Sequence, residues 1–190
     1  MQANTQLLAV VLVGGQSRRM GQDKVSLYAP RWQMTLFERC IASLLPLNPG
    51  QIVTSGRMIS PNYPEIADIY PQRGPLSGIH ASLAYCQAHS QFRELLFLAV
   101  DMPQLGCHSL QALLEFGRQQ QRVSSFSQSP IPLYMPLRPD SLVLVEQQLQ
   151  GDDWSLRQLL SLHQGQCLPG ASAEQFININ HPQDWQQHCG

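Results

Sequence analysis

The sequence predicts an α/β protein with a mainly parallel sheet and helices on both faces of that sheet, in a single domain of residues 1–190. Short apolar runs, typical of buried strands, alternate along the chain with segments whose apolar residues recur every three or four positions. Such an alternation builds right-handed βαβ units, which place helices on both sides of a sheet. The chain has 190 residues, of which 43% are hydrophobic, and this suits one compact core.

Two runs predict central strands. Leu7–Val13 is an unbroken run of seven apolar residues, too short for a buried helix and followed by Gly14-Gly15. Leu95–Val100 is a second fully apolar run, closed by Asp101-Met102-Pro103. Weaker strands are expected between stretches rich in Pro, Gly and Asn, at Gln51–Ser55, Glu65–Tyr70 and Phe176–Asn180.

Helices are expected where apolar residues follow the helical period. From Leu36 to Leu45 they recur at three- and four-residue intervals until Pro46. Ser109 is expected to cap a helix that runs past Phe116, and Pro182 to open a last short one. Further helices are expected at Leu76–His89, Ser141–Gln150 and Ser155–Leu162. The Ser- and Pro-rich stretch Ser124–Pro139 should hold a short strand and an irregular excursion.

The composition disfavours several classes of protein. Twelve basic residues against 13 acidic ones give a formal net charge of −1, which offers no long-range attraction for nucleic acid or an anionic membrane. No window reaches the roughly 18 apolar residues of a transmembrane helix, and no basic segment precedes the first apolar run, so a cytoplasmic protein is expected.

The five cysteines form no C-x-x-C pair, which indicates free thiols. The histidine spacing and the lack of a G-x-S-x-G motif disfavour hydrolase chemistry.

Positive charge gathers after the first strand. Lys24 is the only lysine of the chain, and residues 1–37 carry four cationic side chains against one acid. In Gly14–Lys24, three glycines let backbone N–H groups approach a ligand, while Arg18, Arg19 and Lys24 neutralise negative charge. The segment is neither a Walker A sequence nor a G-x-G-x-x-G fingerprint. It predicts a polyphosphate loop; the alternative is a solvated basic loop.

Asp101 is the candidate metal ligand. Ligands of such sheets bind beyond the carboxyl ends of the strands, where both this residue and the glycine loop are expected. A carboxylate there is a typical ligand of Mg²⁺, which keeps several waters and binds substrate phosphates. The alternative is a turn or capping aspartate. Asn178 and Asn180 are two residues apart on an expected strand, so their side chains point to the same side. Together they would face a polar ligand or a metal ion. The alternative is that they are ordinary asparagines at the end of a strand.

The order of residues in the loop resembles a known family. Leu12–Lys24 reads L-V-G-G-Q-S-R-R-M-G-Q-D-K, which is similar to the pattern L-A-G-G-x-S-x-R-M-G-x-D-K of the molybdenum cofactor guanylyltransferases, with Val13 in place of the usual alanine. That family belongs to the wider nucleotidyltransferase superfamily. Three further motifs match in order, at Gly74–Ile79, Val100–Pro103 and Phe176–Pro182, whereas Ser124–Pro139 matches poorly.

The resemblance implies a Rossmann-like three-layer sandwich of the nucleotide-diphospho-sugar transferase type. It implies transfer of GMP from GTP to molybdenum-bearing molybdopterin, release of pyrophosphate, and Mg²⁺ as cofactor. The same resemblance implies molybdenum-insertion proteins and apo-molybdoenzymes as protein partners. It assigns catalytic roles to Lys24, Arg19 and Asp101, and Asp101 would also hold the metal. It assigns nucleotide contacts to Leu12, Val13, Gly14, Gly15, Lys24, Thr54, Asp68, Gly78 and Asp101.

Some of these assignments have alternatives. The family often has asparagine where this chain has Thr54, and Asp68 is otherwise a surface turn acid. Gly78 would present N–H groups to an anion or a guanine edge, or would simply permit close packing. A cytidylyltransferase acting on the same pterin and a sugar-phosphate nucleotidyltransferase are rivals of the same class, although the Gly14-Gly15 pair favours guanine. A non-catalytic nucleotide- or pterin-binding carrier is the rival of another class. A dehydrogenase is disfavoured, because the sequence lacks the dinucleotide-binding motif G-x-G-x-x-G.

Overall fold

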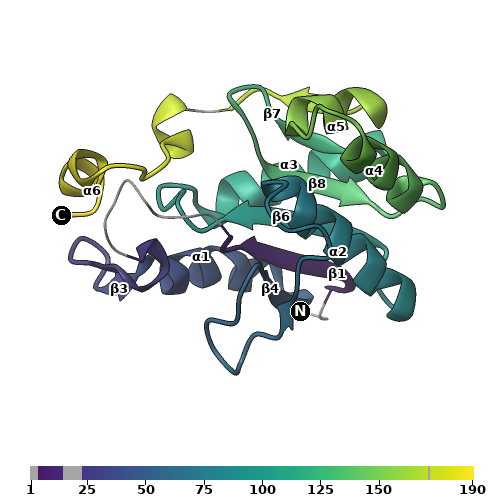
Figure 1. Cartoon of the computed structure of the whole chain (residues 1–190). Helices are drawn as coiled ribbons and strands as arrows, with labels where there is room; N and C mark the ends of the chain where they lie inside the picture. The colour runs from purple at the N-terminus through teal and green to yellow at the C-terminus, as the bar shows by residue number, and fades with distance from the viewer. Residues whose placement is uncertain (1–3, 15–22, 171) are drawn as a thin grey trace.

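The computed structural model describes residues 4–14, 23–170 and 172–190, and Figure 1 shows their arrangement. Seven strands form one sheet in the order β5-β4-β1-β6-β8-β7-β9. Within the described residues β8 alone runs against the other strands of this sheet, so the predicted mainly parallel sheet is confirmed. The strands are β1 (Asn4–Leu12), β4 (Pro49–Ser55), β5 (Glu65–Ile66), β6 (Glu94–Ala99), β7 (Ser124–Phe126), β8 (Ser129–Pro136) and β9 (Gln166–Leu168).

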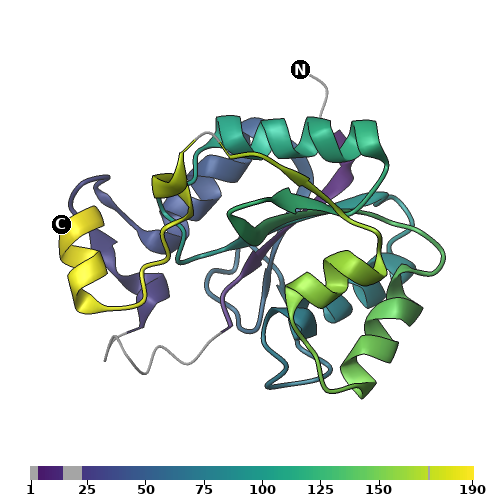
Figure 2. The same ribbon diagram turned by 90° about the horizontal axis from the view of Figure 1, so that it is seen from above.

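Helices cover both faces of the sheet, as predicted. Figure 2 shows α1 and α3 on one side and α2, α4 and α5 on the other. A two-stranded hairpin, β2 (Tyr28–Ala29) with β3 (Met34–Thr35), lies with α6 at one end of the molecule. The helices are α1 (Leu36–Leu44), α2 (Pro75–Ala88), α3 (Cys107–Gln120), α4 (Ser141–Gln150), α5 (Leu156–Leu162) and α6 (Pro182–His188). No helix of the described residues has the length and apolar character needed to cross a membrane.

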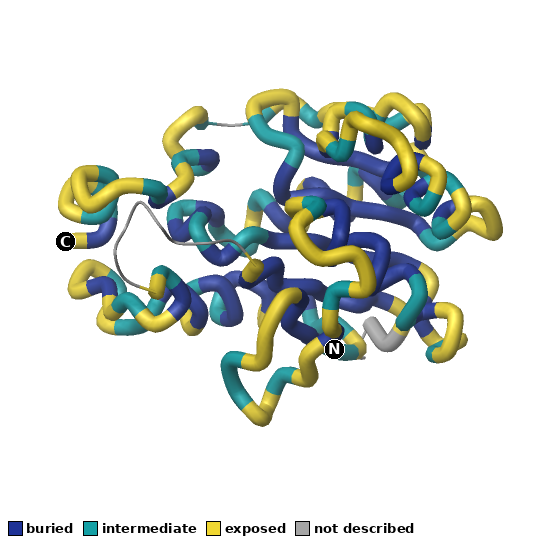
Figure 3. The backbone as a smooth tube through the Cα atoms, in the orientation of Figure 1, coloured by how far each residue is buried: buried dark blue, intermediate teal, exposed yellow. Residues whose placement is uncertain are grey.

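The core lies in the sheet and against it, as the buried backbone in Figure 3 shows. The residues of β1 from Leu7 to Val11 are fully buried, because helices cover this strand on both faces. Helix α1 begins at a capping box in which the Thr35 hydroxyl accepts from the Glu38 N–H, while the Glu38 carboxylate accepts from the Thr35 N–H. All five cysteines are free.

Several expected elements differ in the structure. The helix expected to be capped by Ser109 begins at Cys107, after the N-cap Gly106. Of the strand expected at Glu65–Tyr70, only Glu65–Ile66 pairs, with the last residues of β4. The stretch expected to form a strand at Phe176–Asn180 is not one: a 3₁₀ turn ends at Phe176 and irregular backbone follows.

The stretch Ser124–Pro139 is more regular than its composition predicted. It forms β7 and β8, and β8 pairs antiparallel with β6, with Phe97 opposite Leu133. Proline disfavours a strand only where a ladder N–H is needed, and the buried partner strand outweighs that local preference. Strand β9 was not expected; it adds three residues beside β7.

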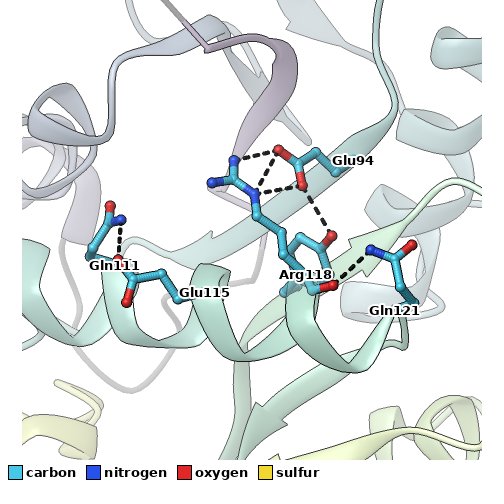
Figure 4. A network of polar contacts seen from close by, with 6 residues as sticks. Glu94, Gln111, Glu115, Arg118 and Gln121 are labelled. Carbon is cyan, nitrogen blue, oxygen red and sulfur yellow. Dashed lines mark hydrogen bonds and ion pairs between the residues drawn. The ribbon is translucent and has the colours of Figure 1, made fainter. Parts of the chain in front are cut away.

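The end of the sheet where β6 begins is closed by a charged network. Glu94 is nearly buried and receives hydrogen bonds from the Arg118 Nε, at 3.0 Å, and from the Tyr134 hydroxyl, also at 3.0 Å. Figure 4 shows Arg118 reaching from α3 to this carboxylate. Tyr134 packs so closely on α3 that a Cβ added at Gly117 would lie 2.1 Å from its Cδ1 atom. The network therefore depends on a glycine at that position.

We expect Gly117→Ala to lower the free energy of unfolding by about 1–3 kcal/mol, because the added methyl group has no room beside the Tyr134 ring. Urea unfolding followed by circular dichroism measures the change. Gly151→Ala is the control: Gly151 has a negative φ, and an added Cβ would lie 3.5 Å from its nearest neighbouring atom, which is ordinary van der Waals contact. Equal losses in the two variants would contradict the packing argument.

Candidate active site

A cavity of about 980 Å³ opens at the carboxyl ends of the central strands. This is the position at which open parallel sheets bind ligands. The amino end of α2 and the start of β8 form its side walls, together with residues from α5 and the C-terminal segment. The lining residues include Leu12, Val13 and Gly14 at the end of β1, Ser55 and Gly56 at the end of β4, Ala99–Met102 at the end of β6, and Lys24, Asp68, Gly74, Pro75, Gly78, Asn178 and Asn180.

Lys24 and Asp101 meet in this cavity. The Lys24 Nζ lies 3.4 Å from the Asp101 Oδ2 and donates to the Asn180 Oδ1 at 2.7 Å. The lysine side chain is 13% exposed and that of the aspartate 25%, so a ligand in the cavity can reach both groups. Three segments far apart in the sequence therefore converge on one ammonium group.

Local hydrogen bonds fix these three segments. Asp23 caps the short 3₁₀ turn that Lys24 begins, because its carboxylate accepts from the Val25 N–H. The same carboxylate pairs with the Arg57 guanidinium from the loop after β4. The Ile179 N–H donates to the backbone carbonyl of Asp101 at 2.8 Å, which docks the C-terminal segment on the end of β6. Asn180 thus takes its place from irregular backbone rather than from the strand expected there.

Asp68 faces the cavity from beyond β5. The Ser55 hydroxyl donates to its Oδ1 at 3.2 Å, and burial raises the pKa of this carboxyl group above its ordinary value. The nearby acid Glu65 acts in the same direction, whereas the Ser55 hydrogen bond opposes it. A carboxylate kept partly dehydrated in a cavity is a candidate binding group for a donor-rich ligand.

Glycines let the floor of the cavity pack closely. A Cβ at Gly78 would lie 2.3 Å from the Ser55 Oγ and 2.9 Å from the Leu12 Cδ2. Gly56 has φ of +106°, and a Cβ there would lie 2.9 Å from the backbone N of Gly14. Gly78 therefore has a packing reason as well as a place on the cavity wall.

The other residues singled out by the sequence fall in different places. Leu12, Val13 and Gly14 line the cavity, whereas Gly15 and Arg19 lie outside the described residues. Thr54 is fully buried and is not among the described residues that line the cavity. Its Oγ1 atom has no hydrogen-bond partner among the residues that the structure describes. The next residue, Ser55, lines the cavity instead, because successive strand residues point to opposite faces. Ser55 was missed because the sequence does not fix which face of β4 looks toward α2.

The donor set suits a divalent ion that binds mainly to substrate. The described residues contain no group of three or more His, Cys, Asp and Glu side chains that could enclose a metal ion. Asp101 offers one carboxylate, and the amides of Asn178 and Asn180 line the same cavity. Magnesium commonly binds through one or two carboxylates, with waters and substrate phosphates completing its shell. These residues therefore fit such an ion and not a structural zinc site.

Lys24, after the first strand, meets Asp101, after a neighbouring strand, at the carboxyl edge of a mainly parallel sheet, and a protein with this fold and family match is a nucleotidyltransferase. The family model described as a MobA-like NTP transferase domain matches residues 9–167. The chain belongs to this family, which confirms the resemblance seen in the sequence motifs.

Named relatives agree with the family. The chain is 35% identical over 182 residues to the molybdenum cofactor guanylyltransferase of Xanthomonas euvesicatoria pv. vesicatoria, covering 93% of this chain and 90% of that protein. It is 26% identical to the probable molybdenum cofactor guanylyltransferase of Flavobacterium johnsoniae, over 92% of each.

Solved structures share the fold. The molybdopterin-guanine dinucleotide biosynthesis protein A of Archaeoglobus fulgidus has a TM-score of 0.74 at 22% identity, over 95% of both chains. The manganese complex of Rv0371c from Mycobacterium tuberculosis has a TM-score of 0.63 at 14% identity, over 98% of both chains. The predicted fold class is therefore confirmed.

We expect Asp68→Asn to raise the melting temperature at neutral pH and to have little effect near pH 4. The folded-state pKa of Asp68 is raised, so the stability of the wild type is highest below the unfolded-state pKa of about 3.9 and falls as the pH rises through the folded-state pKa. Thermal unfolding of both proteins across this range measures the difference. Asp153→Asn is the control of opposite sign, because hydrogen bonds from Ser155 lower the pKa of Asp153. A melting temperature for Asp68→Asn below that of the wild type at neutral pH would contradict the prediction.

Proposed function

We propose that the protein transfers GMP from GTP to molybdopterin that carries molybdenum, forming molybdopterin guanine dinucleotide and releasing pyrophosphate. The observation that carries the proposal is the contact of Lys24 with Asp101 and Asn180 inside the cavity. Family membership and the named guanylyltransferases support the choice of substrates. The protein partners inferred from the resemblance, and a cytoplasmic location, stay predictions.

The reaction is a phosphoryl-centred displacement. A terminal phosphate oxygen of the acceptor attacks the α-phosphorus of GTP, and the bond from that phosphorus to the oxygen bridging to the β-phosphate breaks. The electron pair of the broken bond leaves with pyrophosphate, so negative charge grows on the leaving group. Catalysis of such a step needs positioning and charge stabilisation rather than a covalent protein nucleophile. The site residues supply these two things.

Lys24 is placed to stabilise the leaving pyrophosphate. Its ammonium group is held by the Asn180 amide at 2.7 Å and more loosely by Asp101 at 3.4 Å. A group fixed before the substrate arrives pays little reorganisation cost when charge develops. Triphosphate oxygens compete with Asp101 for the ammonium group, and the carboxylate is then free to bind a metal ion. Arg19 belongs to the same loop, and we assign it a supporting role on the β- and γ-phosphates.

Asp101 is the proposed ligand of a catalytic Mg²⁺, with the amide oxygens of Asn178 and Asn180 beside it in the cavity. When bound there, the ion would supply Lewis-acid stabilisation of the charge that develops on the substrate phosphates. The Ile179 N–H bond to the Asp101 carbonyl keeps the backbone of the ligand in place. This contact also ties the two asparagines to the end of β6.

We propose that the nucleotide base lies between the residues at the end of β1 and the start of α2. Leu12, Val13 and Gly14 offer backbone groups there, and Gly78 leaves room beside them. Asp68, an acceptor when ionised, faces the same space. Guanine presents two adjacent N–H donors on its Watson–Crick edge, which a carboxylate can accept together. This arrangement favours guanine over cytosine.

We expect Lys24→Ala and Asp101→Ala to fold normally and to lose turnover by roughly 10² to 10³, because each removes a prepositioned charge from the transition state. Pyrophosphate release with GTP, Mg²⁺ and loaded molybdopterin measures the rate. Glu115→Gln, a change of an exposed acid on α3, is the control and should keep wild-type turnover. More than about a third of wild-type turnover in either site variant would refute the assigned role.

We expect GTP with Mg²⁺ to raise the melting temperature more than CTP or UTP does, since binding to the folded state stabilises it. EDTA should remove most of the GTP effect, because the ion shields the triphosphate from Asp101. Stabilisation by CTP alone would favour the cytidylyltransferase. GTP binding without pyrophosphate release, even with loaded molybdopterin, would favour a carrier.

A further inference from the structure

An arginine and a tryptophan join two walls of the cavity. The guanidinium carbon of Arg73 lies 3.5 Å from the centroid of the Trp154 ring, which is van der Waals contact directly over the aromatic face. Arg73 precedes Gly74, the N-cap of α2, and Trp154 lies in the loop between α4 and α5. The pair itself is not among the described residues that line the cavity, but its neighbours Gln72, Gly74 and Leu156 are, so the pair lies next to the cavity wall.

The Trp154 ring is held in place by its own loop. Its indole N–H donates to the Gly151 carbonyl at 2.7 Å. The Gln148 amide, buried in α4, donates to the backbone carbonyls of Asp153 and Ser155 at 3.0 and 2.9 Å. These bonds fix the backbone on both sides of the ring. The aromatic face is therefore oriented before any substrate binds.

The Arg73 guanidinium group can still donate hydrogen bonds to a ligand. Within the described ranges its side chain donates no hydrogen bond and forms no ion pair, whereas Arg118 is committed to Glu94 and Arg57 to Asp23. The indole covers the guanidinium carbon at 3.5 Å, and Arg73 is only partly buried. A guanidinium group in this setting can offer its N–H groups and its plane to a ligand.

We propose that the Arg73–Trp154 pair is a stacking platform for the bicyclic heterocycle of the acceptor substrate, an inference that rests on the proposed function. The ligand class is a planar fused heterocycle with a carbonyl group on its edge. Such rings stack on aromatic side chains and on guanidinium planes, and their carbonyl groups accept guanidinium N–H bonds. A pterin has both features.

The acceptor fits this place better than the nucleotide does. The triphosphate is expected at Lys24 and Asp101, and the base at Leu12–Gly14 and Asp68. At about 980 Å³, the cavity is at the upper end of the roughly 300–1,000 Å³ of pockets for one drug-sized ligand, so room remains for a second substrate. The apolar residues Ile131 and Leu156 line the same cavity, which suits a flat heterocycle.

The test is Trp154→Leu, which keeps an apolar side chain but removes the aromatic face. With GTP saturating and the acceptor varied, the acceptor KM should rise about tenfold while kcat stays within about twofold, the size expected for one lost stacking contact. The KM for GTP should not change. Trp154→Phe should recover most of the loss. An unchanged acceptor KM in Trp154→Leu, or an equal rise in the KM for GTP, would overturn the platform.

Trp32→Leu is the matched control. Trp32 is also partly buried and also carries cations over its ring, Arg31 at 5.6 Å and Arg39 at 5.4 Å. Unlike Trp154, it has no close sequence neighbour among the described residues that line the cavity. It should lose similar stability and keep the acceptor KM. If both variants raise that KM equally, the effect is general loosening of the fold and the platform is refuted.

A binding measurement separates this inference from the proposed function. Calorimetry of the full chain with 6-hydroxymethylpterin, a stable compound with the pterin ring, needs no catalysis. Binding by the wild type that weakens about tenfold in Trp154→Leu and in Arg73→Leu supports the platform, even if the wild type releases no pyrophosphate. Equal binding by all three proteins, or none by the wild type at millimolar pterin, refutes it.

Discussion

The site depends on one constraint: the single lysine of the chain has to be held at the rim of the sheet by partners that are remote in sequence. Asp101 and Asn180 provide those partners, at 3.4 and 2.7 Å from the ammonium group. They come together because β1 and β6 are neighbours in the sheet and end at the same edge. The segment Asn178–Asn180 closes the arrangement through the Ile179 bond to the Asp101 carbonyl, so this segment is part of the cavity wall.

The floor of the cavity depends on glycines, because they have no side chain and let the backbone segments pack closely. Gly56 and Gly14 bring the ends of β4 and β1 into backbone contact, and Gly78 lets α2 approach Ser55. Close backbone approach keeps larger side chains out of the floor and leaves the small Ser55 side chain among the lining residues. The Ser55 hydroxyl donates to Asp68, whose pKa is raised by burial at the same wall of the cavity.

The sequence predicts those elements that a local residue pattern marks, and it does not predict those that depend on contacts between distant segments. Strands β1 and β6 are predictable because burial on both faces leaves an apolar run, and the meeting of Lys24 with Asp101 then follows from the carboxyl-edge rule. Strand β8 is not predictable, because its pairing with β6 is non-local and its prolines argue against it. Thr54 and Ser55 differ by one residue, and a one-residue change of register exchanges the two faces of a strand. The Arg73–Trp154 contact leaves no pattern in the sequence, since nothing links a loop before α2 to a loop before α5.

The charge distribution explains how an almost neutral protein handles highly charged substrates. A net charge of −1 gives no long-range attraction, and salt screens exposed charges beyond about 8 Å under physiological conditions. In the proposed function, recognition of the phosphates therefore occurs at contact distance, inside the cavity, where Lys24 is only 13% exposed and water screens it less. In the ligand-free arrangement Asp101 partly neutralises that ammonium group, which offsets the cost of burying a lone cation. Under the same proposal, a triphosphate that arrives with its own divalent ion would satisfy both residues at once. A ligand that carries only one of these charges would leave one residue without a partner, so the proposed pairing would select for a metal-bound nucleotide.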